Sequence, residues 1–145
     1  MTIAIGADHA GYPLKQALLE RVLKGYDVID LGTDSTAPVD YPDIARRVAT
    51  VVAAGKADKG ILICGTGIGM SIAAGKVRGI RAARCTEPFS AELSRRHNDA
   101  NVLVLGAETL GAGVAVEILE TWMQEEFEGG RHRRRVDKIK EIEER

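Results

Sequence analysis

Short apolar runs and segments of helical periodicity alternate along the whole chain. The apolar runs predict strands at residues 2–7, 26–31, 61–64, 80–85 and 101–105. Between the strands, helices are predicted at 14–23, 41–54, behind a glycine-rich turn at 65–69, at 88–97 and at 111–127. Two glycines at 129 and 130 then separate a last, charged helix that begins near residue 133.

Strands that are apolar throughout are buried on both faces, which is typical of a parallel sheet between two layers of helices. The order therefore predicts an α/β fold, a Rossmann-like, doubly wound domain with about five parallel strands and helices on both faces. The charged helix would be a C-terminal extension. Because the sequence has no internal repeat and no low-complexity linker, residues 1–145 are predicted to form a single domain.

Chemically capable residues follow three of the predicted strands. Asp8 and His9 follow the first strand, Cys64 ends the third and Cys85 ends the fourth. In doubly wound folds, ligands bind beyond the carboxyl ends of the strands, so we expect these side chains at the ligand-binding edge. Asp8 is also a residue type that caps helices, and the local sequence favours neither role over the other.

The segment after Cys64 has the features of an anion-binding loop. Three alternating glycines leave backbone N–H groups free to point at a ligand, and the helix behind them adds the positive end of its dipole. A thiol beside such groups loses its proton more easily than a free thiol. Taken alone, however, the segment is more typical of a small buried cysteine before an ordinary turn.

Composition limits the partners of the protein. The chain has a formal net charge of −1 and 4% aromatic side chains, so neither nucleic acid nor an anionic membrane is expected as a partner. No apolar run approaches the roughly 20 residues that span a bilayer, and the N-terminus lacks signal-peptide features. Two cysteines and three histidines without metal-ligand spacing predict no metal site and a reducing, cytoplasmic setting.

Two polar segments nearer the C-terminus hold further candidates. His97 follows two arginines that suit the end of a helix, and histidine is the usual proton carrier near neutral pH. Arg131 and Arg135 are four residues apart, so on a helix they share a face and suit a phosphate clamp. A solvated run of charges is the alternative interpretation of this cationic segment.

Two other motifs do not fit the chain. A dinucleotide-binding loop follows the first strand as G-x-G-x-x-G, whereas here G-x-G-x-G follows the third. The phosphate loop of thiol phosphatases is headed by a cysteine but is closed by an arginine, where this chain has Met70.

Six motifs, in order along nearly the whole chain, resemble one family, the type B ribose-5-phosphate isomerases. The wider group includes galactose-6-phosphate isomerase subunits and allose-6-phosphate isomerase. The matching segments are GADHAG at 6–11, VDYPD at 39–43, ILICGTGIGMSIAA at 61–74, GIRAA at 79–83, SRRHNDANVL at 94–103 and FEGGRHRRRV at 127–136.

The resemblance implies an aldose–ketose isomerase that interconverts ribose 5-phosphate and ribulose 5-phosphate without metal or cofactor. It implies that Cys64 moves a proton between C1 and C2, that His97 opens the furanose ring, and that Thr66 and Asp8 assist near the sugar oxygens. The enediolate would be held by the loop Gly65, Thr66, Gly67, Ile68 and Gly69.

The same resemblance assigns the remaining substrate contacts. Tyr41 would lie against the sugar and Asn98 would bind it. The phosphate would be taken by His9, Arg131 and Arg135. Because the sites of this family are built at a homodimer interface, we expect a homodimer, or a tetramer that contains it.

Two positions depart from the usual residues of the family. Glu108 stands where many members have an arginine that helps to bind phosphate, and Gly75 stands where an asparagine is usual. A carboxylate at 108 removes a cation and adds repulsion, which leaves a hexose 6-phosphate of the allose or galactose type as an alternative substrate. A non-catalytic phosphosugar-binding domain is a further alternative, which the presence of both Cys64 and His97 opposes.

Overall fold

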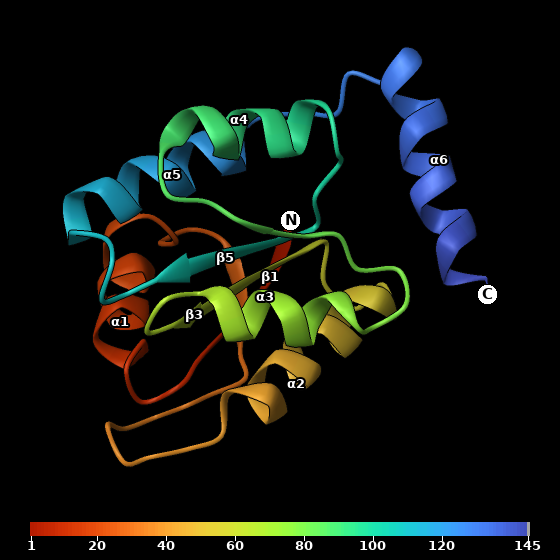
Figure 1. Cartoon of the computed structure of the whole chain (residues 1–145). Coiled ribbons are helices and arrows are strands. Elements are labelled where there is room, and N and C mark those ends of the chain that lie inside the picture. Colours follow the sequence, from red (N-terminus) through yellow and green to blue (C-terminus); the bar gives the residue numbers. More distant parts are fainter. Residues whose placement is uncertain (145) are drawn as a thin grey trace.

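The computed structural model of the protein describes residues 1–144, in which strands and helices alternate as predicted (Figure 1). The elements are β1 (Thr2–Ala7), α1 (Tyr12–Arg21), β2 (Asp27–Asp30), α2 (Tyr41–Ala53), β3 (Lys59–Cys64), α3 (Ile68–Gly75), β4 (Ala82–Arg84), α4 (Pro88–Arg96), β5 (Val102–Gly106), α5 (Ala112–Gln124) and α6 (Arg131–Glu143).

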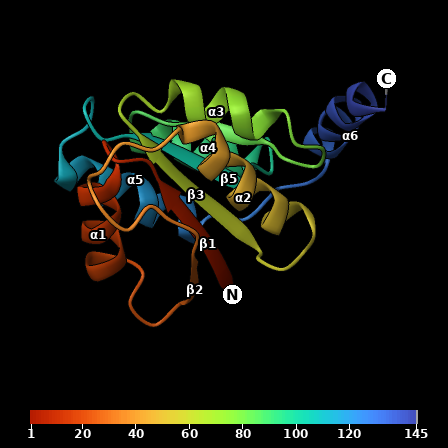
Figure 2. The same cartoon turned by 90° about the horizontal axis from the view of Figure 1, so that it is seen from below.

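All pairings in the sheet are parallel, and the strand order is β2-β1-β3-β5-β4. Helices α1, α4 and α5 pack on one face through residues such as Leu18, Ala91 and Ile118. Helices α2 and α3 cover the other face with Val48 and Met70, and Figure 2 shows both layers along the sheet. The predicted doubly wound α/β fold is therefore confirmed.

Strand β4 is shorter than the predicted strand at 80–85. It lies at the edge of the sheet and pairs with β5 alone. Just before it, the backbone N–H of Arg81 donates to the side chain of Asn101 at 2.8 Å rather than to a neighbouring strand. The side-chain contact replaces a ladder hydrogen bond, so regular pairing begins only at Ala82.

The reversal of strand order between β1 and β3 sets the position of the site. From β1 the chain continues to β2 on one side, and from β3 it continues toward β5 and β4 on the other. Connections that leave in opposite directions open a crevice at the carboxyl ends of these two strands. The segments that follow β1 and β3 therefore meet at this crevice.

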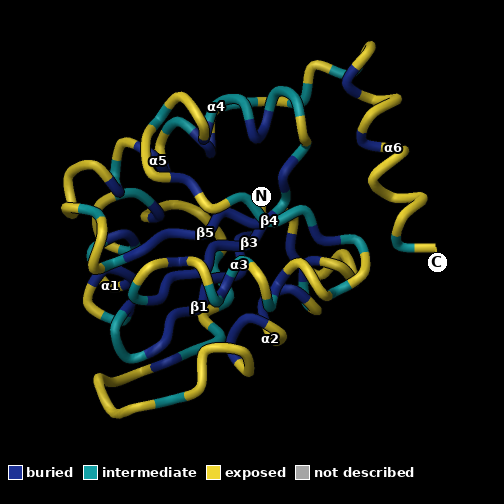
Figure 3. The backbone as a smooth tube through the Cα atoms, in the orientation of Figure 1, coloured by how far each residue is buried: buried dark blue, intermediate teal, exposed yellow. Residues whose placement is uncertain are grey.

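Helix α6 stands away from the sheet and its covering helices, at the right of Figure 1. It begins at Arg131, two residues earlier than predicted, and most of its surface is exposed (Figure 3). Val136 is buried, whereas Ile139 and Ile142 are exposed. Its far end is held by the Glu143 carboxylate, which accepts the Gly79 N–H at 3.1 Å.

Within residues 1–144, no helix is both long enough and apolar enough to cross a membrane.

The close approach of the α1 N-terminus to β3 gives a test of this packing. A Cβ atom at Gly11 would lie 2.4 Å from the backbone oxygen of Ile63. Because neither backbone segment can yield easily, Gly11→Ala is expected to lower the free energy of unfolding by about 1–3 kcal/mol. Urea denaturation measures the change.

Gly113→Ala is the matched control, because a Cβ atom there meets nothing within 4 Å. Since Gly113 lies in α5, alanine should leave the free energy of unfolding unchanged or raise it by up to about 1 kcal/mol. Equal stability of the two variants would contradict the close contact at Gly11.

Candidate active site

An open cavity of about 460 Å³ lies at the carboxyl ends of β1 and β3. It brings together residues that lie up to 64 positions apart in the chain. Its lining consists of Asp8, Tyr41, Cys64, Gly65, Thr66, Ile68, Gly69 and Ile72. All of these except Ile72 are residues that the sequence singled out.

Cys64 is the last residue of β3 and is only 5% exposed, yet it lines the cavity. Its backbone is fixed on one side, because its carbonyl oxygen accepts the Ala107 N–H at 2.8 Å. A cysteine placed in this way is shielded from bulk water but open to a ligand in the cavity. The location suits a base that acts on a bound molecule.

The glycine-rich loop turns directly from Cys64 into α3. Gly67 caps the helix. Its φ of 81° is a left-handed conformation, which favours glycine. Within residues 1–144, the backbone N–H groups of Gly65, Thr66 and Gly67 donate to no acceptor, whereas that of Ile68 donates to the Thr66 hydroxyl at 3.2 Å. Free donors at the start of a helix are suited to hold an anion.

Tyr41 fits against this loop only because residue 69 is glycine. A Cβ atom at Gly69 would lie 2.4 Å from the Tyr41 ring. Tyr41 is the first residue of α2 and remains 40% exposed. The ring therefore forms a wall of the cavity that is still open to a ligand.

Asp8 and His9 have well-defined hydrogen bonds after β1. The Asp8 carboxylate accepts the Gly11 N–H at 3.0 Å, so it supports the turn into α1 and also lines the cavity. His9 accepts the Val39 N–H at 3.2 Å through Nδ1. In the neutral ring the proton then sits on Nε2, which leaves His9 a donor for an anion. His9 is not part of the cavity lining.

His97 and Asn98 lie at the end of α4 and do not line the Cys64 cavity. The His97 ring stacks on that of His132, with centroids 4.0 Å apart and planes 8° from parallel. Glu128 completes this group, with carboxylate oxygens 3.8 Å and 3.7 Å from Nε2 of His97 and His132. Sequence reasoning did not identify Glu128 or His132.

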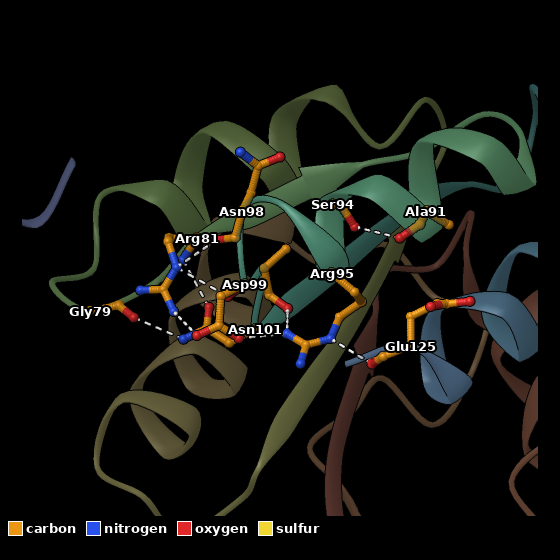
Figure 4. A network of polar contacts seen from close by, with 10 residues as sticks. Gly79, Arg81, Ala91, Ser94, Arg95, Asn98, Asp99, Asn101 and Glu125 are labelled. Carbon is orange, nitrogen blue, oxygen red and sulfur yellow. Dashed lines mark hydrogen bonds and ion pairs between the residues drawn. The ribbon is translucent and has the colours of Figure 1, made fainter. Parts of the chain in front are cut away.

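A partly buried polar network holds the backbone that follows His97 (Figure 4). Arg81 donates to the carbonyl oxygens of Asn98 and Asp99, each at 3.0 Å. Arg95 donates to the Asp99 carboxylate at 3.0 Å and to the Ala100 carbonyl oxygen at 2.7 Å. The Asn98 side chain points away from this network, so its amide stays available to a ligand.

Arg95 and Arg96 both lie in the last turn of α4, as expected for cations at a helix C-terminus. The Arg95 side chain is 10% exposed and lies inside this network, because three acceptors from the following loop and from the end of α5 surround it. Arg96 does lie at the surface, where it forms ion pairs with Glu92 and Glu128.

Arg131 and Arg135 lie on the first two turns of α6 and are exposed. They share a face of the helix, as their spacing predicts, but they do not line the Cys64 cavity. The predicted site residues therefore form two groups within one chain. One surrounds Cys64, and the other combines the end of α4 with α6.

Two further charged side chains touch the glycine loop. A Cβ atom at Gly65 would lie 3.1 Å from a carboxylate oxygen of Glu108, so this carboxylate packs on the loop. Arg84 donates to the Thr66 carbonyl oxygen at 2.7 Å. Arg84 ends β4. The rule that ligands bind at the carboxyl ends of strands could therefore have identified Arg84 from the sequence.

The only group of metal-ligating side chains within residues 1–144 is His97, Glu128 and His132, whose ligand atoms lie within 4.8 Å of one another. The two rings are parallel, so the lone pairs in their planes run side by side rather than toward one point. Arg96 already donates to the Glu128 carboxylate at 2.7 Å. This geometry suits a stacked pair better than a metal centre.

Comparison with known proteins gives consistent results over the full chain. A model of the family described as Ribose/Galactose Isomerase matches residues 3–139. Ribose-5-phosphate isomerase B of Escherichia coli K12 is 51% identical over 144 residues, 99% of this chain and 97% of that protein. D-erythrulose-4-phosphate isomerase of Pectobacterium atrosepticum is 46% identical over 142 residues, 96% of this chain and 93% of that protein.

Solved structures agree with these sequence matches. Ribose-5-phosphate isomerase B of Clostridium thermocellum superposes with a TM-score of 0.97 at 54% identity, over 99% of this chain and 98% of that one. The Mycoplasma genitalium enzyme with bound ribulose-5-phosphate gives a TM-score of 0.94 at 42% identity, over 99% and 96% of the two chains.

The two free cysteines should differ in reactivity. Burial raises the pKa of the Cys85 thiol to about 11, so it is almost fully protonated at neutral pH. Cys64 instead lines an open cavity, where a small alkylating reagent can reach it. Iodoacetamide at pH 7.5 is expected to alkylate Cys64 first, as peptide mass spectrometry measures.

Cys85→Ala is the control, and it should leave the rate and extent of alkylation unchanged. Modification of Cys85 before Cys64 in the folded protein would contradict this assignment.

Proposed function

We infer the activity from one premise, which is that the chain belongs to the Ribose/Galactose Isomerase family. We propose that this aldose–ketose isomerase interconverts ribose 5-phosphate and ribulose 5-phosphate. The observation that carries the proposal is that one cavity is lined by both Cys64 and the loop whose backbone N–H groups have no acceptor within residues 1–144. High identity over the full length to ribose-5-phosphate isomerase B supports the choice of substrate.

In the proposed reaction, the Cys64 thiolate removes the proton from C2 of the open-chain aldose and returns it to C1. The C1 oxygen gains a proton as the C2 oxygen loses one, so the product is the ketose. Between the two steps, negative charge spreads over both oxygens of the enediolate. The N–H groups of Gly65, Thr66 and Gly67 can donate to this charge, and such donors are worth roughly 3–4 kcal/mol each in oxyanion holes.

The other residues of the cavity have supporting roles in this proposal. Tyr41 lies against the sugar, and Asp8 and the Thr66 hydroxyl lie near its oxygens. The furanose ring is opened by His97, while Asn98 binds the sugar. The phosphate is held by His9, Arg131 and Arg135, which orient the substrate far from the reacting carbons.

We propose that each complete site is shared by two copies of the chain in a homodimer. The support is the division seen within one chain, since His97, Asn98 and the α6 arginines do not line the Cys64 cavity. Apolar surface is present at both places, with Ile68 and Ile72 exposed at the cavity and Ile139 and Ile142 exposed on α6. In a two-fold dimer, the cavity surface of each chain would contact the α6 surface of the other chain, so the same contact would occur twice.

We further propose that residues 1–145 act as one domain in the cytoplasm, to which the two unpaired cysteines are suited. The relatives compared above do not favour the hexose 6-phosphate alternative, because they are named as isomerases of ribose 5-phosphate or D-erythrulose 4-phosphate.

Activity on phosphosugars tests the assignment directly. The purified protein is expected to isomerise ribose 5-phosphate without added metal, at a higher kcat/KM than allose 6-phosphate, galactose 6-phosphate or free ribose. Cys64→Ser should lower kcat by at least about 100-fold, because a hydroxyl is a much weaker base than a thiolate. Binding of the phosphosugar, measured by calorimetry, should persist in this variant.

Cys85→Ala is the matched control and should keep kcat within about twofold, since Cys85 lies outside the cavity. Near-normal turnover by Cys64→Ser would refute the role of the thiol, and a preference for a hexose 6-phosphate would refute the substrate.

Complementation between two inactive variants tests the shared site. Cys64→Ser and His97→Asn chains carry different tags and are co-expressed, and the doubly tagged dimer is purified. One of its two sites then combines an intact Cys64 with an intact His97 from the other chain. The expected kcat per dimer is about half that of the unaltered protein.

Singly tagged dimers of each variant are the controls and should keep only the low residual activity of that variant. A doubly tagged dimer as inactive as these controls would show that each site lies within one chain.

A further inference from the structure

The stack between His97 and His132 connects two segments that are far apart in the sequence. His97 ends α4, and its backbone N–H donates to the Leu93 carbonyl oxygen at 2.8 Å. His132 lies in the first turn of α6. The ring of His132 covers one face of the His97 ring, whose side chain remains 33% exposed. Rotation of the His97 ring about its side-chain bonds would break this contact.

His132 is well suited to be a neutral support for the stack. It is 6% exposed, and its Nε2 atom has no hydrogen-bond partner within residues 1–144. Burial, followed by the neighbouring His97 and Arg131, lowers the pKa of the His132 imidazole. A neutral ring can lie under His97 while His97 carries a proton, whereas two charged rings 4.0 Å apart would repel each other.

Glu128 faces both imidazole rings and is itself fixed. Its carboxylate accepts from Nε of Arg96 at 2.7 Å, and its backbone N–H donates to the Arg96 carbonyl oxygen at 3.0 Å. Arg96 precedes His97, so these two bonds tie Glu128 to the end of α4. The carboxylate oxygens then lie 3.8 Å from Nε2 of His97 and 3.7 Å from Nε2 of His132, so Glu128 faces both rings.

We propose that His132 and Glu128 are positioning residues that hold the His97 imidazole in one orientation for proton transfer during ring opening. This inference rests on the proposed function, in which His97 opens the furanose ring. His97 is faced by His132 on α6 and by Glu128 before α6, and Arg96 on α4 pairs with Glu128. Arg131 and Arg135 on α6 act on His132.

Ring opening can be measured separately from the isomerisation step. Ribose 5-phosphate is mainly a furanose, so its conversion needs both steps. Ribulose 5-phosphate cannot close a furanose ring, because the oxygen on C5 carries the phosphate. Exchange of its C1 proton in deuterated water needs only the base and the enediolate. The ratio of the two rates therefore reports on ring opening, and NMR measures both.

Glu128→Gln and His132→Ala are expected to lower kcat on ribose 5-phosphate by at least about tenfold, while C1 exchange stays within about twofold. His132→Phe keeps an aromatic support for the stack and should restore most of the loss seen with alanine. In a His97→Asn background, His132→Ala should cause little further loss, because no imidazole remains to be positioned. Arg134→Ala, at an exposed position of the same helix, is the matched control and should change neither rate.

Unchanged kcat in both variants would overturn the inference, and so would equal losses in the two rates, which would indicate a general structural effect. A full additional loss in the His97→Asn background would also overturn it. If the unaltered protein catalyses neither reaction, the proposed function fails instead, so the two failures can be told apart.

Discussion

The parallel pairing of β1 with β3 is the constraint on which the rest of the site depends. Ala7 pairs with Ile63, and the Asp8 N–H donates to the Ile63 carbonyl oxygen at 3.1 Å, so Asp8, directly after β1, and Cys64, at the end of β3, lie at the same level. Side chains alternate along a strand, so a shift of one residue would turn Cys64 to the opposite face. Burial of both faces of the sheet opposes such a shift. The position of the thiol is therefore fixed by the stability of the whole core.

The conformation of the loop after Cys64 is fixed by close packing and not by hydrogen bonds from its own backbone N–H groups. A Cβ atom at Gly106 would lie 2.6 Å from the backbone of Thr66, so β5 approaches the loop closely from below. Gly69 admits the Tyr41 ring on the other side. Enclosed in this way, the loop cannot turn inward to satisfy its own N–H groups, which remain available to a ligand.

Much of the fold and of the cavity could be predicted from the sequence, because apolar runs and the rule for doubly wound sheets depend on local patterns. Strand order depends on pairing between distant segments, which local patterns do not encode. The residues around His97 were missed for a related reason. His132 is hidden in a cationic run, and only its spacing to Val136 and Ile139 indicates that it faces inward on α6. The burial of Arg95 was not predicted either, because its carbonyl acceptors lie in other segments.

The charges beside the glycine loop determine how a phosphosugar can lie in the cavity. Glu108 packs on Gly65, and a carboxylate there repels a phosphate dianion. Arg84 donates to the Thr66 carbonyl oxygen and offsets part of this charge. A single, dispersed negative charge on the enediolate suffers less repulsion than a phosphate at the same place. In the proposed reaction, the substrate therefore directs its reacting carbons to the loop and its phosphate toward His9 and the cations of α6, which leaves the thiol beside C1 and C2.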